Sequence, residues 1–570
     1  MKFFKIIVPI AVVTLLSYWA IKPLFIPGFF PIHDDTQVAR VYEMTKSLKD
    51  GIFPVRWVAD LGYGYGYPIF SFYAPFAYYV GSAFEFLGFD ALAATKIMMG
   101  LGILLSGLFM YFLAKEFWGK LGGIVSALLY VYAPFHAVDI YVRGDVTEFW
   151  AYAFIPLAFL GFYKVYKTKG NFKWIVVGAL GYAGIILSHN LTAMMVTPFI
   201  LIVILSYCYI AVKKKELSTM RYSLYAFVLG LALSAFYFIP ALLEQRYTNI
   251  LSQIGGGAHF NDHFVCVYQL WQSQWGFGGS APGCIDGASF MIGKIHIILS
   301  LFATAAIIAL SILKKISGKE EKVVIMLFCV VGLLFSIFLM LPLSQPLWSA
   351  ISLMAFFQFP WRFLLMTSFF TSILSGSLLW VMHKTVRNEW TECLISGAII
   401  VAILLINVKF FIPQTILGKA ADDYTNMQTL RWLTSKISDE YMPKDFPKPT
   451  NEDDVVRERV TFNPNDIEII NRTEKTHVID LNLKAARPTK IHFNIAYFPS
   501  WKLSVDGVPQ GSIVSKGYDV SLPSGNHRVE MKFKESNTAK IANLISFAGL
   551  AAIIVGIIRF KKKTQYGQGS

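Results

Sequence analysis

The chain has 570 residues, of which 55% are hydrophobic and 15% are charged, whereas soluble proteins average about 45–50% and about 25%. This composition excludes a disordered chain, a collagen-like chain and a typical soluble enzyme, and five cysteines are too few for a disulfide scaffold. In so apolar a chain, the formal net charge of +15 is first of all a signal of membrane topology.

About twelve stretches are long and apolar enough to cross a bilayer, which takes about 20 residues. They lie near residues 4–26, 91–114, 120–137, 148–166, 173–188, 192–212, 222–242, 291–313, 323–342, 361–382, 393–412 and 539–559. The stretch 68–89 is rich in Phe, Tyr, Pro and Gly, and we expect it to lie in the outer interface. The sequence thus predicts an α-helical polytopic membrane protein.

Basic residues predict how these spans are oriented. The loops after spans two, four, six, eight and ten are rich in Lys and Arg, and so are both ends of the chain. All of these segments fall on one side, which the positive-inside rule makes cytoplasmic. We therefore expect a multi-pass protein of the plasma (cytoplasmic) membrane with both termini in the cytoplasm. Because the basic excess marks orientation, the lipid bilayer is an expected partner and nucleic acid is not.

Composition divides the chain into three predicted parts. Residues 1–412 form a transmembrane domain with outer loops at 27–89 and 244–290, and residues 539–570 form an anchor helix with a basic tail. Residues 413–538 are polar and include alternating runs at 478–483, 490–497, 502–505, 518–522 and 527–533. With turn-like Asp506-Gly507 and Ser524-Gly525 between runs, they predict an extracytoplasmic β-sandwich.

Acidic residues open the first outer loop, directly after the first span. His33 precedes the adjacent pair Asp34 and Asp35, and a surface helix is expected over about 36–49. One aspartate could cap that helix, but a cap uses one carboxylate and leaves the other unexplained. The pair is therefore a candidate functional site.

A second acidic cluster lies at residues 139–148, at the mouth of the fourth span. Asp145 can cap the helix that starts at residue 146, and Glu148 then lies in its first turn. Capping accounts for one or both of these acids, but it leaves Asp139 and Arg143 without a role. The acids of this loop are therefore candidates as well.

Polar side chains also stand at two other span ends on the predicted outer face. His189 and Asn190 follow the fifth span, where polar groups are costly unless paired, and an interhelical hydrogen bond is the structural alternative. Arg362 ends the sequence Phe359-Pro360-Trp361-Arg362 at the head of the tenth span. Its guanidinium can hold a phosphate through two hydrogen bonds, or reach lipid headgroups.

The first loop also contains alternating glycines and tyrosines at 62–67, preceded by Arg56. Flat faces of Tyr65 and Tyr67 suit sugar rings, and an aromatic belt at the membrane interface is the alternative. In the long outer loop, Cys266 and Cys284 could form a disulfide in an oxidising compartment.

These motifs, in this order and on one side, resemble the GT-C superfamily of polytopic glycosyltransferases, which use polyprenyl-phosphate-linked sugars. They are similar in finer detail to the bacterial and archaeal membrane proteins labelled "6-pyruvoyl-tetrahydropterin synthase-related" and to YfhO-like membrane proteins. The motifs that carry the resemblance are His33-Asp34-Asp35, Gly64-Tyr65-Gly66-Tyr67-Pro68, Arg143-Gly144-Asp145-Val146-Thr147-Glu148, Ser188-His189-Asn190, Phe359-Pro360-Trp361-Arg362, Tyr497-Phe498-Pro499-Ser500-Trp501 and Asp506-Gly507. The label is not literal, because the sequence contains no compact zinc-enzyme domain.

The resemblance implies a GT-C-like transmembrane domain and a role for each motif. Asp35 or Asp34 would be the general base, and Asp145 or Glu148 would assist through a metal or the acceptor. A divalent cation, Mg²⁺ or Mn²⁺, held by Asp34, Asp145 and Glu148 is the cofactor it suggests, although the strict Asp-x-Asp spacing of some relatives is absent. The expected substrate contacts are His33, Arg56, Tyr65, Tyr67, Arg143, His189, Asn190 and Arg362.

The function expected from these features is transfer of a sugar from a polyprenyl-phosphate-linked donor to an extracytoplasmic acceptor, which is a glycan, a lipid or a protein. Chemistry agrees, since glycosyl transfer needs a carboxylate to take the acceptor proton and cations to stabilise the departing phosphate. A glycan or lipid flippase is the first alternative, which would favour charged or broken helices near the bilayer midplane. A non-catalytic anchored envelope protein is the second.

Overall fold

Long apolar helices make up most of the computed structural model, which describes residues 2–213, 217–444 and 446–566. Among these residues, nine helices are long and apolar enough to cross a membrane, or ten if one bent pair counts as a span. The long helices are α1 (Lys2–Leu16), α6 (Ala91–Val131), α8 (Val146–Lys167), α9 (Phe172–Ser188), α10 (Asn190–Lys213), α11 (Leu217–Glu244), α13 (Lys294–Ile312), α14 (Glu321–Met340), α16 (Leu364–Thr385), α17 (Glu389–Asn407) and α20 (Asn537–Tyr566). A polytopic helical membrane protein is therefore confirmed.

The number of long apolar helices differs from the predicted twelve spans at three places. Predicted spans two and three share the label α6 but are its two arms: the chain turns back at Gly119, with φ 76° and ψ −175°, so that Gly107 of the first arm lies against Val131 of the second. The first predicted span is the bent pair, with 42° between α1 and the following α2 (Tyr18–Ile21) and η1 (Lys22–Phe25). The helix α9 has 17 residues, at the lower limit of about 17–25 residues for a span, and is not among the nine.

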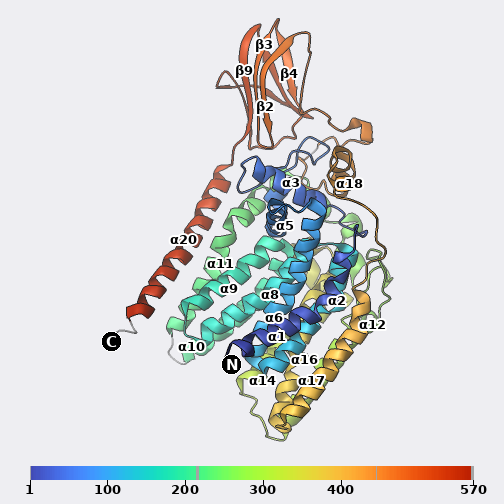
Figure 1. Cartoon of the computed structure of the whole chain (residues 1–570), viewed down its shortest axis with the longest axis vertical. Coiled ribbons are helices and arrows are strands. Elements are labelled where there is room, and N and C mark those ends of the chain that lie inside the picture. The colour runs from blue at the N-terminus through green and yellow to red at the C-terminus, as the bar shows by residue number, and fades with distance from the viewer. Residues whose placement is uncertain (1, 214–216, 445, 567–570) are drawn as a thin grey trace.

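The helices α8 and α16 form the centre of the bundle (Figure 1). In the most apolar stretch of each helix, 94% of the residues are buried in the span that contains α16 and 89% in α8. Only 17% are buried in α20. Small residues allow this packing, because the Gly161 backbone of α8 lies directly against Gly178 of α9. The N-terminal end of α8, which carries the second acidic cluster, is therefore held by a rigid core.

Short helices form the outer loops and connections. These are α3 (Gln37–Lys49), α4 (Ile69–Phe72), α5 (Phe76–Phe86), α7 (Pro134–Val138), the π-helical η2 (Asp139–Arg143), η3 (Gln245–Tyr247), η4 (Ile250–Gln253), η5 (Gly256–Ala258), η6 (Phe260–His263), α12 (Val267–Trp271), η7 (Pro342–Ser344), α15 (Gln345–Ala350), η8 (Ser352–Phe357), η9 (Pro360–Phe363), η10 (Val408–Phe410), α18 (Asp422–Thr425), the π-helical η11 (Thr429–Thr434), α19 (Ser435–Ile437) and η12 (Glu452–Asp454). As expected, residues 68–89 form short helices, and the 11 residues of α5 are too few to span.

The predicted C-terminal β region is present as two antiparallel sheets. One has the order β1-β4-β8-β7 and the other β2-β3-β9-β5-β6. The strands are β1 (Val460–Phe462), β2 (Ile467–Lys475), β3 (Val478–Ala485), β4 (Thr489–Phe493), β5 (Trp501–Val505), β6 (Val508–Pro509), β7 (Ser512–Val514), β8 (Gly517–Leu522) and β9 (Gly525–Phe533). Asp506 and Gly507 both have positive φ and close the β5–β6 hairpin, as their sequence predicted.

Figure 1 shows the two sheets at one end of the bundle, with α3 and α18 near that end. From there α20 runs along the outside of the bundle to the opposite end, where the N-terminal end of α1 also lies. The predicted ranges 1–412, 413–538 and 539–570 include residues 1, 214–216, 445 and 567–570, which lie outside the described residues. Cytoplasmic termini remain a prediction.

The first outer loop is bound to the C-terminal region through buried polar contacts. Asp50 accepts hydrogen bonds from the backbone and the hydroxyl of Thr476 at 2.7 and 2.6 Å. Asp60 forms ion pairs with Lys46 and, at 3.8 Å, with Arg431. The first loop and the C-terminal region therefore share one interior.

A buried carboxyl at this junction gives a pH-dependent prediction. Glu43 on α3 is fully buried, and burial together with Asp60 raises its pKa well above the ordinary 4.5, although Lys46 opposes the shift. Since folding makes this carboxyl hold its proton, Glu43 destabilises the protein increasingly as pH rises above 4.5. We expect Glu43→Gln to raise the melting temperature at pH 7.5, with a gain that shrinks toward pH 4.5, as measured by thermal denaturation in detergent.

The exposed Glu468 on β2 supplies the control, since Glu468→Gln should change the melting temperature equally little at both pH values. A lower melting temperature for Glu43→Gln at pH 7.5 would show that Glu43 is ionised in the folded protein.

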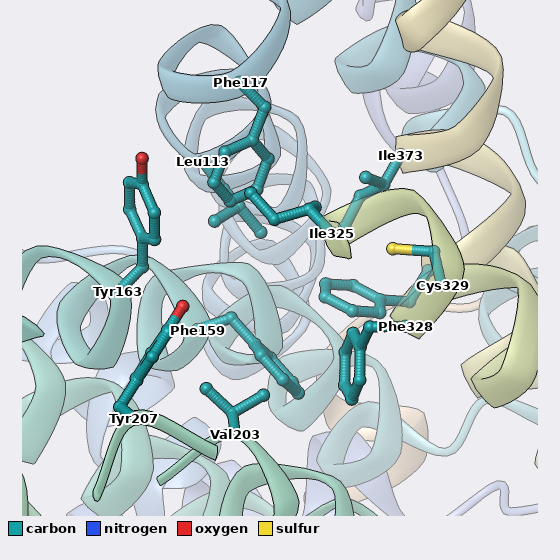
Figure 2. A pocket seen from close by; sticks show the side chains of 11 residues that line it. Leu113, Phe117, Phe159, Tyr163, Val203, Tyr207, Ile325, Phe328, Cys329 and Ile373 are labelled. Carbon is teal, nitrogen blue, oxygen red and sulfur yellow. The ribbon is translucent and has the colours of Figure 1, made fainter. Parts of the chain in front are cut away.

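The bundle core encloses a small apolar cavity of about 50 Å³ between α6, α8, α10, α14 and α16 (Figure 2). Phe159, Phe328 and Cys329 are among its walls, and the Tyr163 and Tyr207 side chains also line it. Phe159 lies about four turns along α8 from Asp145, or about 20 Å. This cavity is therefore part of the helix packing and lies far from the acidic clusters.

Candidate functional site

Backbone hydrogen bonds join the first two outer loops, which were predicted to lie on the same side of the membrane. The N–H groups of His33 and Asp34 donate to the carbonyls of Val142 and Arg143 at 3.1 and 2.9 Å. Gly144 permits the approach, because it has φ +67° and any Cβ would lie 2.4 Å from the Ile32 side chain. The Asp34 side chain therefore lies beside the second acidic cluster.

Arg143 is the centre of that cluster. Its Nη1 donates to Asp139 Oδ1 at 2.5 Å and to Glu148 Oε2 at 2.7 Å, while Nη2 donates to Asp145 Oδ2 at 3.0 Å. The guanidinium also lies 5.0 Å from the ring centroid of Trp361. One buried cation thus holds three acids that are spread over ten residues of sequence.

Arg362 brings a second guanidinium into the same cluster from the other end of the chain. Its Nη1 donates to Glu148 Oε2 and lies 3.7 Å from Asp145 Oδ2. Glu148 is fully buried, and its second oxygen, Oε1, has no hydrogen-bond partner among the described residues. Asp145, Glu148, Arg143 and Arg362, which the sequence placed on one side, thus lie together in the structure, whereas Asp35 does not join them.

His189 completes the cluster and forms a set with metal-ligand spacing. One ligand atom each from Asp145, Glu148 and His189 lie within 4.8 Å of one another. His189 Nδ1 lies 2.8 Å from Thr192 Oγ1 and accepts from the Thr192 N–H at 3.3 Å. The two carboxylates and the imidazole fit a divalent cation such as Mn²⁺, and the Oε1 of Glu148 has no other partner among the described residues.

The acids differ in their affinity for protons. Burial, with the neighbouring Asp145, raises the pKa of Asp34 to about 6, although Arg143, Arg40 and Arg362 act against it. Burial also opposes ionisation of Asp145, but His189, Arg143 and Arg362 keep its pKa below the ordinary range. Asp34 is half-buried, so it combines access with the proton affinity of a good base.

Asp35, the other candidate base, lies outside this cluster. Its Oδ2 is 3.9 Å from Lys419 Nζ, and its side chain is 28% exposed. The backbone bonds of His33 and Asp34 to residues 142 and 143 place the Asp34 carboxylate, and not that of Asp35, beside the Arg143 cluster. Which of the two is the general base stays a prediction.

Three predicted substrate contacts have structural roles in the junction with the C-terminal region. Arg56 donates to Glu535 Oε1 at 3.0 Å and to Asn543 Oδ1 at 2.8 Å. Tyr65 packs edge-on against Phe446, and the hydroxyl of the fully buried Tyr67 accepts from the Tyr441 N–H at 3.1 Å. The prediction that these tyrosines present open faces to a sugar is wrong, because both rings are buried against chain that lies far away in the sequence.

Two further predicted contacts make backbone hydrogen bonds. Asn190 Nδ2 donates to the Phe72 carbonyl at 3.2 Å, which is the interhelical bond considered as the alternative. His33 is exposed, and its Nε2 lies 2.9 Å from the Phe277 carbonyl in the long outer loop. The long loop therefore reaches the turn that carries Asp34.

The disulfide between Cys266 and Cys284 is present in that loop. The bridge joins residues 18 positions apart. By restricting the unfolded chain, a loop of this length stabilises the fold by about 3 kcal/mol. We expect Cys266→Ser with Cys284→Ser to leave the helix bundle folded and to make residues 253–290 more sensitive to limited proteolysis. The matched control is Cys393→Ser, which removes an exposed free cysteine. Unchanged cleavage of the loop in the double variant would contradict this expectation.

Sequence reasoning missed three residues that connect to the site: Gln37, Arg40 and Thr147. Gln37 Nε2 donates to the carbonyls of Asp34 and Gly144, and Thr147 Oγ1 donates to Asp145 Oδ1 at 2.7 Å. Arg40 is only 3% exposed. Helical spacing offered a signal, since Gln37 and Arg40 lie three residues apart on one face of the helix after Asp34.

Residues 70–258 match the family described as "6-pyruvoyl-tetrahydropterin synthase related domain; membrane protein". A curated protein from Lactococcus lactis subsp. cremoris (strain MG1363), described only as an uncharacterized protein, is 27% identical over 221 residues, which are 37% of this chain and 35% of that protein. The chain therefore spans about a third of the length of this relative.

Two solved structures are among those that the chain matches at low similarity. The Archaeoglobus fulgidus oligosaccharyltransferase tethered to an acceptor peptide matches with a TM-score of 0.46 and 13% identity, over 80% of this chain and 61% of that one. ArnT from Cupriavidus metallidurans, bound to undecaprenyl phosphate, matches with a TM-score of 0.35 and 15% identity, over 70% and 63% of the two chains. The resemblance to 6-pyruvoyl-tetrahydropterin synthase-related membrane proteins, predicted from the motifs, is confirmed over residues 70–258, which include the second acidic cluster and His189.

Proposed function

We propose that the protein is an integral membrane glycosyltransferase, which moves a sugar from a polyprenyl-phosphate-linked donor to an extracytoplasmic glycan, lipid or protein acceptor. One observation carries the proposal. The half-buried Asp34 lies beside a buried cluster of three acids, two guanidiniums and a histidine, all at one end of the helix bundle. A base next to fixed cations is the arrangement that glycosyl transfer requires.

In this reaction Asp34 takes the proton of the acceptor hydroxyl as the new glycosidic bond forms. The bond between the sugar and the phosphate of the donor breaks, and the lipid phosphate leaves with the bonding electrons. Arg362 is the cation for that phosphate, because its Nε–H is buried and has no partner among the described residues. Arg143 keeps Asp145 and Glu148 in place.

Asp145, Glu148 and His189 are the residues that would hold a divalent cation, in place of the predicted set that included Asp34. When bound, such a cation would help to neutralise the departing phosphate. An imidazole ligand favours Mn²⁺ over Mg²⁺, which prefers oxygen ligands and retains water. Transfer activity should therefore fall on chelation and return more fully with Mn²⁺ than with Mg²⁺.

An apolar cavity near the first loop suits the lipid chain of the donor. It has a volume of about 560 Å³ and is formed by η1, α5 and α6, with Phe25, Phe84 and Phe89 among its walls. Phe25 is 71% exposed and Phe89 46% exposed, as expected for rings that face hydrocarbon. The element η1 ends at Phe25, nine residues before Asp34, which makes this cavity the candidate place for the lipid chain.

Release of lipid phosphate tests the proposal. The purified protein in liposomes is given a polyprenyl-phosphate sugar and a panel of envelope glycans, lipids and peptides, and both free polyprenyl phosphate and the glycosylated product are measured. Product formation by the wild type, and its loss in Asp34→Asn, supports the proposal. Movement of the donor across the liposome without bond cleavage would favour the flippase and overturn the transferase.

A further inference from the structure

Arg40 on α3 ties the candidate site to chain that precedes the β-sandwich. Its Nη2 donates to Ser438 Oγ at 2.8 Å and its Nη1 donates to Tyr78 OH at 3.3 Å. The guanidinium carbon lies 4.2 Å from the ring centroid of Tyr73. A residue of the first loop is thus fixed by a hydroxyl almost 400 residues later in the sequence.

One branch of this contact leads to Asp34. The Tyr78 hydroxyl donates to Gln37 Oε1 at 2.7 Å, which orients the amide. Gln37 Nε2 then donates to the carbonyl of Asp34 at 3.1 Å and to that of Gly144 at 2.9 Å. Since these carbonyls belong to the two loops that pair at the site, Arg40 sets where Asp34 stands relative to Arg143.

A second branch leads to Asp145. The ring under the Arg40 guanidinium belongs to Tyr73, whose hydroxyl lies 3.3 Å from Thr147 Oγ1. Thr147 Oγ1 donates to Asp145 Oδ1, which also accepts the Glu148 N–H at 3.1 Å. Asp34 and Asp145 are therefore both reached from the Arg40 guanidinium.

The far end of the connection is itself fixed to the first loop. The Ser438 hydroxyl lies 3.1 and 3.2 Å from the two carboxylate oxygens of Glu440. Asp439 accepts from the Tyr63 hydroxyl at 2.8 Å, and Tyr441 stacks on Phe72 with centroids 5.4 Å apart. The stretch Ser438–Tyr441 is therefore docked by several independent contacts rather than by Arg40 alone.

We propose that Ser438–Tyr441 is a working part of the candidate site, and that Arg40 is the positioning residue through which this stretch aligns Asp34 and Asp145. This inference rests on the proposed function. It explains why an arginine is needed: one planar guanidinium bonds Ser438 and Tyr78 at once and covers Tyr73, which the single ammonium of lysine cannot do. The C-terminal region is then more than a domain anchored to the membrane, because Asp34 is misplaced when this region is not docked.

Arg40→Lys and Ser438→Ala test this with Arg431→Lys as the matched control. Arg431 also belongs to the C-terminal region and contacts the first loop, but through Asp60. Its hydrogen bonds to the carbonyls of Val456 and Arg457 lie within the C-terminal region. Misplacing the base should lower kcat for sugar transfer by about 10–100-fold in the two test variants, with less than about a 3-fold change in KM for the lipid donor. The control should keep at least about half of the wild-type kcat.

Hydrogen exchange supplies a readout that needs no activity. The Asp34 N–H, which donates to the Arg143 carbonyl, should exchange faster in Arg40→Lys and Ser438→Ala than in wild type and in Arg431→Lys. Faster exchange together with the kcat loss supports the inference. Unchanged exchange at Asp34, a wild-type kcat in Arg40→Lys, or equal losses in Arg431→Lys would overturn it.

The two proposals can fail separately. If the wild-type protein releases no lipid phosphate with any acceptor, the transferase is overturned. In that case exchange at Asp34 alone decides the positioning role, which stands if only the Arg40 and Ser438 variants loosen it and falls if they do not.

Discussion

Replacing Asp34 with asparagine is expected to lower sugar transfer by about 10²–10⁴-fold, the usual contribution of a general base, whereas Asp35→Asn should stay near wild type. Asparagine keeps the shape of the side chain but cannot take the acceptor proton. The two carboxylates are neighbours in sequence, yet Asp34 is next to the Arg143 cluster and Asp35 is 3.9 Å from Lys419. Initial rates of polyprenyl-phosphate release in liposomes measure the effect.

Asp35→Asn is the matched control, because it makes the same chemical change one residue away. Burial raises the pKa of both carboxyls, so neither asparagine variant should lower the melting temperature at pH 7.5, which separates lost chemistry from lost folding. A larger loss of rate in Asp35→Asn than in Asp34→Asn would show that the wrong carboxylate has been assigned.

Replacing Arg143 with leucine is expected to destabilise the protein by about 3–5 kcal/mol, the usual cost of removing one partner from a buried ionic cluster. Leucine leaves Asp139, Asp145 and Glu148 buried together, with Arg362 and His189 left to offset their charge. Neutralising one acid should relieve part of the repulsion, so the double variant with Asp139→Asn should recover part of the loss. Thermal denaturation in detergent measures both variants.

Arg528→Leu is the control for this prediction. Arg528 also pairs with an aspartate, Asp480 at 2.8 Å, but on the exposed surface of the β-sandwich, where water screens the pair. Its melting temperature should match the wild type. An equally stable Arg143→Leu protein would mean that the acids of the cluster are protonated in the folded state and need no counter-charge.

Sequence alone determined the membrane class, most of the spans and the β region. These features follow from local rules: about 20 apolar residues make a span, and alternation with Asp506-Gly507 makes a hairpin. The number of spans was less predictable, because the first span is bent by 42° and α9 has only 17 residues, whereas predicted spans two and three are both present as the arms of α6 on either side of Gly119. Four strands, β1, β2, β6 and β7, were missed, since short or largely exposed strands carry little alternation.

For the site, the sequence could name the residue types and predict that they lie at one end of the bundle. Asp145, Glu148, Arg143, His189 and Arg362 were chosen on this basis, because paired charges at span ends are costly unless they are used. The structure brings these five together. Their convergence was predictable because alternate span ends share one face of the membrane.

Only the tertiary structure decided which aspartate joins them and which aromatic residues do not. Asp34 was selected over Asp35 by backbone hydrogen bonds to residues 142 and 143, and Tyr65 and Tyr67 were buried by chain from residues 441 and 446. Arg40 likewise gains its position from Ser438. Local sequence determines helices, strands and charge, whereas the partner of a side chain depends on contacts between residues far apart in the chain, and no local pattern encodes these.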